Sequence, residues 1–139
     1  MVVLTLSVTF IGCGESGVTP EISTIHVSLL VQTRGEDIRW FRDVAVPKGA
    51  NAYELTDQVT ERNLVANYHP EFKSHFVEGI FGVKNNNPNF WLIWLWSDAE
   101  GKWETLPVSA DLYTLKDRDV LAWHYTDTSQ EDNSPSAIP

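Results

Sequence analysis

The run Phe90–Trp96, which reads Phe-Trp-Leu-Ile-Trp-Leu-Trp, constrains the fold of this chain more than any other stretch. It contains no charged residue, and turn-forming segments bound it on both sides, Asn85–Asn89 before it and Asp98–Gly101 after it. A membrane-spanning helix needs about 20 apolar residues, so the run is too short to cross a bilayer. Its length fits a β-strand that is covered on both faces.

Side chains of a strand alternate between its two faces. One face of this strand therefore carries Phe90, Leu92, Trp94 and Trp96, and the other carries Trp91, Ile93 and Leu95. Burying one large ring contributes about 2–3 kcal/mol, so an uncovered face would be costly. The cover is either protein alone or protein together with a ligand, and the function depends on which of the two is present.

The composition sets further limits. The 139 residues suffice for one domain with its own core and for tails. The formal net charge of −9 disfavours binding to nucleic acid or to an anionic membrane by general electrostatic attraction, so no nucleic acid partner is predicted. Cys13 is the single cysteine, which excludes a disulfide and a cysteine-based metal cluster within these residues. Rings of the six tryptophans are either core or binding surface.

The N-terminal segment is uncharged from Val2 to Ile11 and ends in Gly12-Cys13. It resembles a bacterial lipoprotein signal in which Phe10–Cys13 is the lipobox. This resemblance implies a signal peptide over residues 1–12 and lipid attachment at Cys13, so that the protein is extracytoplasmic and anchored to the cell membrane by that lipid. The alternative is a hydrophobic strand with a buried thiol. The small and polar residues over 13–23 favour a flexible tether instead.

The domain is expected to open with a β-hairpin followed by a helix. Residues 25–32 alternate between apolar and polar side chains, and residues 38–46 pair back onto them after a turn. Asn51 and Glu54 have the spacing of a capping box, so a short helix should begin at the residue after Asn51. The segment 67–70 should end it.

Strands are expected after the helix. Residues 76–83 form a strand whose two glycines indicate a bulge or a close approach. Residues 102–106 pair with the tryptophan-rich strand after a turn in which Gly101 has positive φ, and residues 120–125 form the last strand. Residues 127–139 have the composition of a disordered tail. This order predicts an α+β fold, β-grasp-like, in which one short helix packs on a mixed or antiparallel sheet.

Several segments resemble one family in their order and spacing. They are residues 44–55, 77–82, 90–95 and 109–123. The family is largely uncharacterised and is similar to the C-terminal β-domain of the cobalamin carriers transcobalamin and intrinsic factor. The resemblance covers residues 24–126 and implies the fold and, as a second step, a cobalamin or other corrinoid ligand. Arg118 stands where the family has glycine before an aspartate, so this turn need not have a positive φ.

The sequence gives little reason to predict catalysis or a protein-bound metal ion. His69, Glu71 and His75 could ligate a metal ion if their loop folded back, but they do not have the spacing of a metal motif. His124 is expected to be structural. There is no nucleophile elbow and no phosphate-binding loop, so the protein is predicted not to be an enzyme.

We predict a non-catalytic domain that binds a corrinoid or another ring-containing small molecule. The predicted ligand-binding residues are Trp91, Trp94, Trp96, Trp103, Tyr113, Trp123, Asn86 and Asn87. Phe90–Leu95 is expected to be the central strand of the sheet, and a ligand would reach its end at Trp96 beside the neighbouring loops. Two alternatives remain open at this stage, a protein–protein interaction module of the cell envelope and carbohydrate binding through exposed tryptophan rings.

Overall fold

The computed structural model describes residues 14, 17, 21–35 and 37–139. The predicted signal peptide and the predicted lipidation site at Cys13 lie outside these residues, as does most of the predicted tether. Within the described residues, no helix combines the length and the apolar character that crossing a membrane requires.

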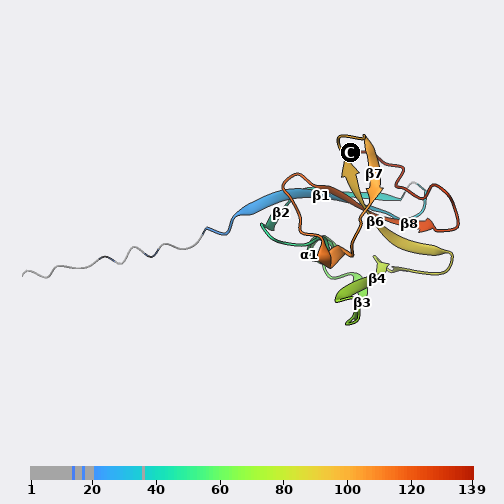
Figure 1. The fold of residues 1–139 in the computed structure, drawn as a ribbon, viewed down its shortest axis with the longest axis horizontal. Coiled ribbons are helices and arrows are strands. Elements are labelled where there is room, and N and C mark those ends of the chain that lie inside the picture. The colour runs from blue at the N-terminus through green and yellow to red at the C-terminus, as the bar shows by residue number, and fades with distance from the viewer. Residues whose placement is uncertain (1–13, 15–16, 18–20, 36) are drawn as a thin grey trace, which may run out of the picture.

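A five-stranded mixed sheet forms the frame of the domain (Figure 1). Its strands are β1 (Thr24–Gln32), β2 (Ile38–Pro47), β6 (Asn89–Ser97), β7 (Lys102–Thr105) and β8 (Val120–Asp127), in the spatial order β2-β1-β8-β6-β7. β1 and β8 are parallel, and the other neighbours are antiparallel. The α+β class and the mixed sheet are therefore confirmed. The central strand is β8 rather than the tryptophan-rich β6, because the last strand of the chain inserts between β1 and β6.

The helix α1 (Ala52–Val59) begins as the sequence predicts and ends earlier. Asn51 Oδ1 accepts a hydrogen bond from the Glu54 backbone N–H at 2.8 Å, and Glu54 Oε2 accepts one from the Asn51 N–H at 2.9 Å, which completes the capping box. The helix cannot continue beyond its last turn, because Glu61 and Arg62 have φ angles of 52° and 65°. The prediction that the helix extends almost to residue 67 is therefore wrong.

A second, three-stranded antiparallel sheet lies on the side of the main sheet that carries α1 (Figure 1). It contains β3 (Leu64–His69), β4 (Ser74–Ile80) and β5 (Val83–Lys84). The predicted strand at 76–83 is thus split by a turn in which Gly82 has a φ of 79°. Glu78 is the extra residue of a bulge opposite β3, and a Cβ on Gly79 would lie 3.3 Å from the Val83 carbonyl oxygen. The close approach is confirmed for Gly79, which lies beside the bulge residue, whereas Gly82 lies in the turn and has open space around its Cβ position.

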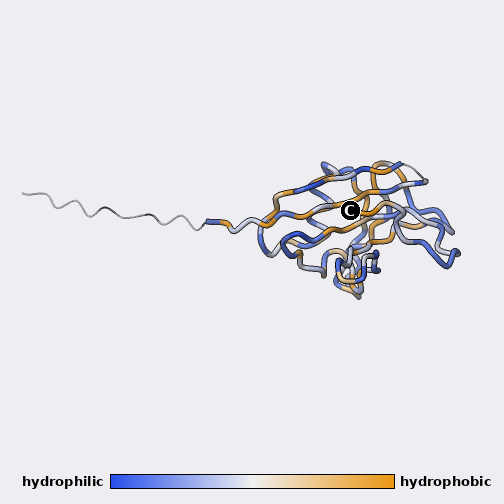
Figure 2. Tube along the Cα trace, turned by 90° about the horizontal axis from the view of Figure 1, so that it is seen from above, coloured by the Kyte–Doolittle hydropathy of each residue, from blue (hydrophilic) through white to orange (hydrophobic). Residues whose placement is uncertain are grey.

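The two faces of the main sheet have separate cores. The first core joins the sheet to α1 and β4 and contains Leu29, Val31, Leu55, Ile80, Trp91, Leu121 and Trp123. The second core lies on the opposite face and contains Leu30, Trp94, Trp103 and Ala122. The alternation predicted for β6 is confirmed, since Ile93 and Leu95 pack on the first core whereas Leu92 and Trp96 pack on the second. Hydrophobic residues recur along the strands of the sheet (Figure 2).

Residues 128–139, which we call the C-terminal strap, cover the second core. Their composition predicted disorder, yet the strap packs on the sheet and its end lies beside β7 (Figure 1). Trp103 Nε1 donates a hydrogen bond to the Ala137 carbonyl oxygen at 2.7 Å. The buried Gln32 side chain donates to Ser136 Oγ at 2.8 Å and accepts from the Ser136 N–H at 3.1 Å. The strap therefore provides the acceptor of the Trp103 indole and two hydrogen bonds to Gln32, whose Nε2 also donates to the Gly35 carbonyl oxygen.

Arg118 adopts a φ of 69°, so the turn keeps a left-handed residue although glycine is absent. For a residue with a Cβ, this conformation costs about 1–2 kcal/mol of conformational energy. Because glycine also gains entropy in the unfolded chain, we expect Arg118→Gly to raise the free energy of unfolding by only about 0.5–1 kcal/mol. Urea denaturation measures the change.

Lys116→Gly is the matched control for this prediction. Lys116 lies in the same turn and is not among the described residues with positive φ, so glycine should destabilise the protein at this position. An equal loss of stability in both variants would contradict the explanation from backbone strain.

Candidate ligand-binding site

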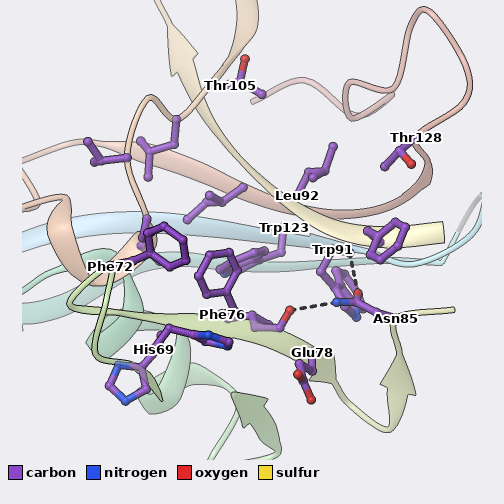
Figure 3. Close-up of a pocket in the computed structure, with 18 residues that line it drawn as sticks. His69, Phe72, Phe76, Glu78, Asn85, Trp91, Leu92, Thr105, Trp123 and Thr128 are labelled. Atoms are coloured by element: carbon purple, nitrogen blue, oxygen red, sulfur yellow. Dashed lines mark hydrogen bonds between the residues drawn. The ribbon is translucent and has the colours of Figure 1, made fainter. Parts of the chain in front are cut away.

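An open cleft of about 600 Å³ lies between the small sheet and one end of β6 (Figure 3). Its walls are mainly apolar. They include Phe72, Phe76 and Val77 on one side, Phe90–Ile93 on the other, and Leu106, Val108 and Trp123. Small-molecule sites in proteins commonly have volumes of about 300–1,000 Å³, apolar walls and a few polar groups. The cleft has the size and the character of such a site.

The cleft exists because β7 pairs with only part of β6. β7 lies against Trp94–Ser97, and the preceding residues of β6 have β8 as their only neighbouring strand. On the open side the Trp91 N–H donates to Asn85 Oδ1 at 2.8 Å, while Asn85 Nδ2 donates to the Val77 carbonyl oxygen at 3.1 Å (Figure 3). Asn85 thus connects β6 to β4 through its side chain instead of through a strand ladder. The main sheet and the small sheet therefore do not join into one sheet at Asn85.

Three aromatic rings stand at the mouth of the cleft. Phe72 and Phe76 are 61% and 47% exposed, and their ring centroids lie 5.8 Å apart. His69 contacts Phe76 edge to face at 4.7 Å. Exposed apolar groups that gather at a cleft mark an interaction site. These phenylalanines are not among the ligand-binding residues predicted from the sequence, although the aromatic side chains concentrated between Tyr68 and Phe76 are a signal for them.

His75 also lines the cleft, and its ring is held from three directions. Nδ1 lies 3.0 Å from Asp111 Oδ2, and the same oxygen accepts the His75 backbone N–H at 2.8 Å. Tyr53 stacks on the ring with a centroid distance of 4.5 Å and an interplanar angle of 12°, and Tyr68 contacts it at 5.0 Å. Burial, with Asp57 and Asp111 nearby, raises the pKa of Tyr53, which therefore remains neutral.

The histidines of this region do not gather around one point. His69 Nδ1 pairs with Glu71 Oε1 at 3.2 Å, whereas His75 pairs with Asp111. The described residues include no group of three or more His, Cys, Asp or Glu side chains that could hold a metal ion.

Of the predicted ligand-binding residues, Trp91 and Trp123 line the cleft. Both are buried, and both indole N–H groups have partners inside the protein. Trp91 Nε1 donates to the Val83 carbonyl oxygen and Trp123 Nε1 donates to Thr56 Oγ1, each at 2.8 Å. These two rings form part of the cleft wall and at the same time belong to the first core.

Trp94, Trp96 and Trp103 lie on the opposite face of the sheet, in or against the second core. Trp96 and Trp103 contact each other edge to face, with centroids 5.3 Å apart. Trp96, the predicted contact at the strand end, is half-buried and donates its indole N–H to Asp98 Oδ1 at 3.0 Å. All six tryptophans belong to the described residues, and none is exposed. Because none of these rings is exposed, the structure does not support the alternative of carbohydrate binding through exposed tryptophan rings.

Tyr113, Asn86 and Asn87 do not line the cleft. The Tyr113 hydroxyl donates to Asp119 Oδ2 at 3.0 Å, and burial together with the Asp119 charge raises the pKa of Tyr113 to about 12. Asn86 and Asn87 are exposed in the turn before β6. Their neighbour Asn85 is the member of this loop that reaches the cleft.

His124 supports the strap. The ring lies on the second face of the sheet, with Nδ1 2.8 Å from the Asn133 carbonyl oxygen, and burial lowers the pKa of His124.

A folded-state pKa of His124 below the unfolded value of about 6.5 means that its contribution to stability is complete above pH 6.5 and is lost as the pH falls through the folded pKa. We expect the melting temperature to fall more steeply below pH 6.5 in the native protein than in His124→Gln. Parallel curves for the two proteins would contradict this assignment.

Comparison with known proteins identifies the fold. No known family matches the sequence, and no curated protein does. A crystal structure of haptocorrin in complex with Cbi matches with a TM-score of 0.63 and 18% identity, over 81% of this chain and 27% of that chain. This chain shares its fold with a part of haptocorrin. It spans about a quarter of the haptocorrin chain.

A second solved structure matches over nearly its whole length. It is a putative metal binding protein from Ruminococcus gnavus ATCC 29149, with a TM-score of 0.57 and 16% identity, over 74% of this chain and 97% of that chain. At these identities the likeness shows the fold alone. The transcobalamin-like fold expected from the sequence is supported in this sense.

Proposed function

We propose that this domain binds a ring-containing small molecule, most specifically a corrinoid, in the cleft between β6 and the small sheet, and that it does so without catalysis. The observation that carries the proposal is the apolar cleft of about 600 Å³ with Phe72 and Phe76 exposed at its mouth. A flat apolar ligand would bury both rings, which is favourable.

The fold supports the choice of ligand class. Haptocorrin carries a similar domain within a structure that is in complex with Cbi. Numbering the strands of the main sheet 1 to 5 in chain order gives the spatial order 2-1-5-3-4, with α1 after the second strand. This arrangement supports a β-grasp-like domain, to which the hairpin β3–β4 is added as one wall of the cleft. Because this domain corresponds to only about a quarter of the haptocorrin chain, we expect it to contact one side of the ligand.

We also propose that the protein is exported and tethered by a lipid on Cys13, which rests on the sequence of residues 1–13. Mass spectrometry of the membrane fraction tests it. A mature N-terminus at Cys13 with a diacylglycerol modification is expected. An unmodified chain that begins at Met1 would overturn it.

The test of ligand binding is a titration of the purified chain with dicyanocobinamide, followed by tryptophan fluorescence and thermal shift. Trp91 and Trp123 lie in the cleft wall, so binding should quench fluorescence and raise the melting temperature. Phe76→Ala should weaken binding about tenfold, because it removes about 1.4 kcal/mol of ring contact.

Leu112→Ala is the matched control, because Leu112 is 54% exposed and does not line the cleft. It should leave the affinity unchanged. If millimolar ligand produces neither quenching nor a thermal shift, the corrinoid proposal is wrong.

A second candidate is docking of a protein partner at the same place. Phe72 and Phe76 are exposed at the mouth of the cleft, and a partner could cover both rings with apolar side chains of its own. Co-purification of an envelope protein that is lost in Phe76→Ala, with no response to corrinoids, would favour this candidate.

A further inference from the structure

A polar hollow of about 440 Å³ lies beside the first half of β1, and it shares no lining residue with the candidate ligand-binding cleft. β8 pairs with β1 only from Ser28 onward, so the turn over residues 116–119 takes its place before that residue. In this turn the Arg118 N–H donates to the His26 carbonyl oxygen at 2.7 Å, and Asp117 Oδ1 accepts the His26 N–H at 2.9 Å. These bonds fix one wall of the hollow against β1.

A bulge in β2 forms the opposite wall. Arg42 and Asp43 together lie opposite Ser28, and the Asp43 N–H donates to Ser28 Oγ at 3.2 Å. Asp43 and Arg118 both line the hollow, and they have φ angles of 51° and 69°. Glycine would adopt this conformation without strain. Residues held in left-handed conformations cluster at ligand sites, where the side chain has a use that compensates for the strain.

Two arginines and two aspartates bring both signs of charge to this hollow. The ion pairs among the described residues include neither Arg42 nor Arg118, and neither Asp43 nor Asp117. The Arg42 guanidinium is held instead over the Trp40 ring, 4.1 Å from its centroid. Arginines without a carboxylate partner remain available for an external phosphate or carboxylate, which they bind through pairs of hydrogen bonds.

We propose that this hollow binds a small zwitterion in which a phosphate is joined to an ammonium, as in phosphoethanolamine. Arg42 and Arg118 would hold the phosphate, because two guanidinium groups provide more donors than one carboxylate can use. Asp43 and the free Oδ2 of Asp117 would face the ammonium. A chain with a net charge of −9 repels a free anion at long range, whereas it repels a zwitterion little. This site is separate from the proposed corrinoid site and does not depend on it.

The test is a titration of the purified chain with phosphoethanolamine, followed by ¹H–¹⁵N NMR. The backbone amides of Asp43 and Arg118 and the Trp40 indole should shift. Inorganic phosphate and ethanolamine should each bind about tenfold more weakly, because each satisfies only one sign of charge. Inorganic phosphate that binds as tightly would overturn the assignment to a zwitterion. No shift of these signals with phosphoethanolamine would overturn the site.

Arg118→Gly is the decisive variant, because it keeps the left-handed conformation and is expected to be slightly more stable than the native protein. It should weaken binding of phosphoethanolamine about tenfold, and unfolding cannot cause that loss. Arg39→Gln is the matched control. Arg39 lies on the same strand as Arg42 and stacks on Phe81 at 4.5 Å, but it does not line the hollow. Unchanged binding in Arg118→Gly, or an equal loss in Arg39→Gln, would overturn the role of Arg118.

The same chemical group occurs free in solution and as the headgroup of phosphatidylethanolamine. Co-sedimentation with phosphatidylcholine vesicles, with and without phosphatidylethanolamine, separates these sources. Binding that requires phosphatidylethanolamine and is lost in Arg118→Gly supports the headgroup, whereas binding of soluble phosphoethanolamine alone supports a free ligand. Arg118→Gly should bind dicyanocobinamide as the native protein does. A parallel loss of both ligands would overturn the assignment of two separate sites.

Discussion

Replacing Trp123 with alanine is expected to lower the free energy of unfolding by about 3–5 kcal/mol. The side chain is only 4% exposed and lies on the central strand of the sheet, in the first core. Its Nε1–H donates to Thr56 Oγ1, so the substitution removes both packing and a buried hydrogen bond between β8 and α1. Chemical denaturation followed by circular dichroism measures the loss.

Trp40→Ala is the control for this loss. Trp40 is half-buried on β2 against the second core, with Arg42 over its ring at 4.1 Å. It should cost clearly less stability than Trp123→Ala. If Trp123→Ala were to cost under about 1 kcal/mol while abolishing ligand binding, the ring would be a contact surface and not core.

Deleting the C-terminal strap after Asp127 is expected to expose the second core and to destabilise the domain by about 2 kcal/mol. The deletion removes the acceptor of the Trp103 indole, both hydrogen bonds between Gln32 and Ser136, and the carbonyl beside His124. These bonds contribute about 1 kcal/mol each, and the entropy regained by the free strap offsets part of the loss. Tryptophan emission should shift to longer wavelength, and acrylamide should quench it more strongly.

A chain with residues 128–139 in scrambled order keeps the length and the charge of the strap and serves as its control. It should behave like the deletion, because Ala137 would no longer pack on the second core and Ser136 would no longer bond to Gln32. Unchanged emission and unchanged stability in the deleted chain would show that the strap does not cover Trp103.

The frame of the fold follows from local patterns in the sequence. The alternation over 25–32, the aromatic run of β6 and the Asn51–Glu54 pair each encode an element through residues that are close in the chain. Positive φ at Gly101 follows in the same way from turn chemistry. Strand β3 is different, since Leu64–His69 is partly exposed and becomes a strand only because β4 pairs with it.

The candidate site was harder to predict, because its parts are far apart in the sequence. The prediction selected the tryptophans because their rings are large, but all six side chains are buried or half-buried in the two cores. The exposed rings that line the cleft are Phe72 and Phe76, and the carboxylate that contacts His75 comes from Asp111, 36 positions along the chain. No spacing rule connects these residues before the small sheet folds against the main one.

The sequence by itself determined that this chain forms an α+β domain, which segments become the strands of its main sheet, and which side chains of β6 face each way, because period, caps and turns act within a few residues. Only the tertiary structure decided which rings are covered. Burial depends on what packs across each face, and here the strap covers the second core while the small sheet leaves a cleft at the edge of β6. The tryptophan strand is therefore mainly core, and the cleft beside its first residues is the candidate site.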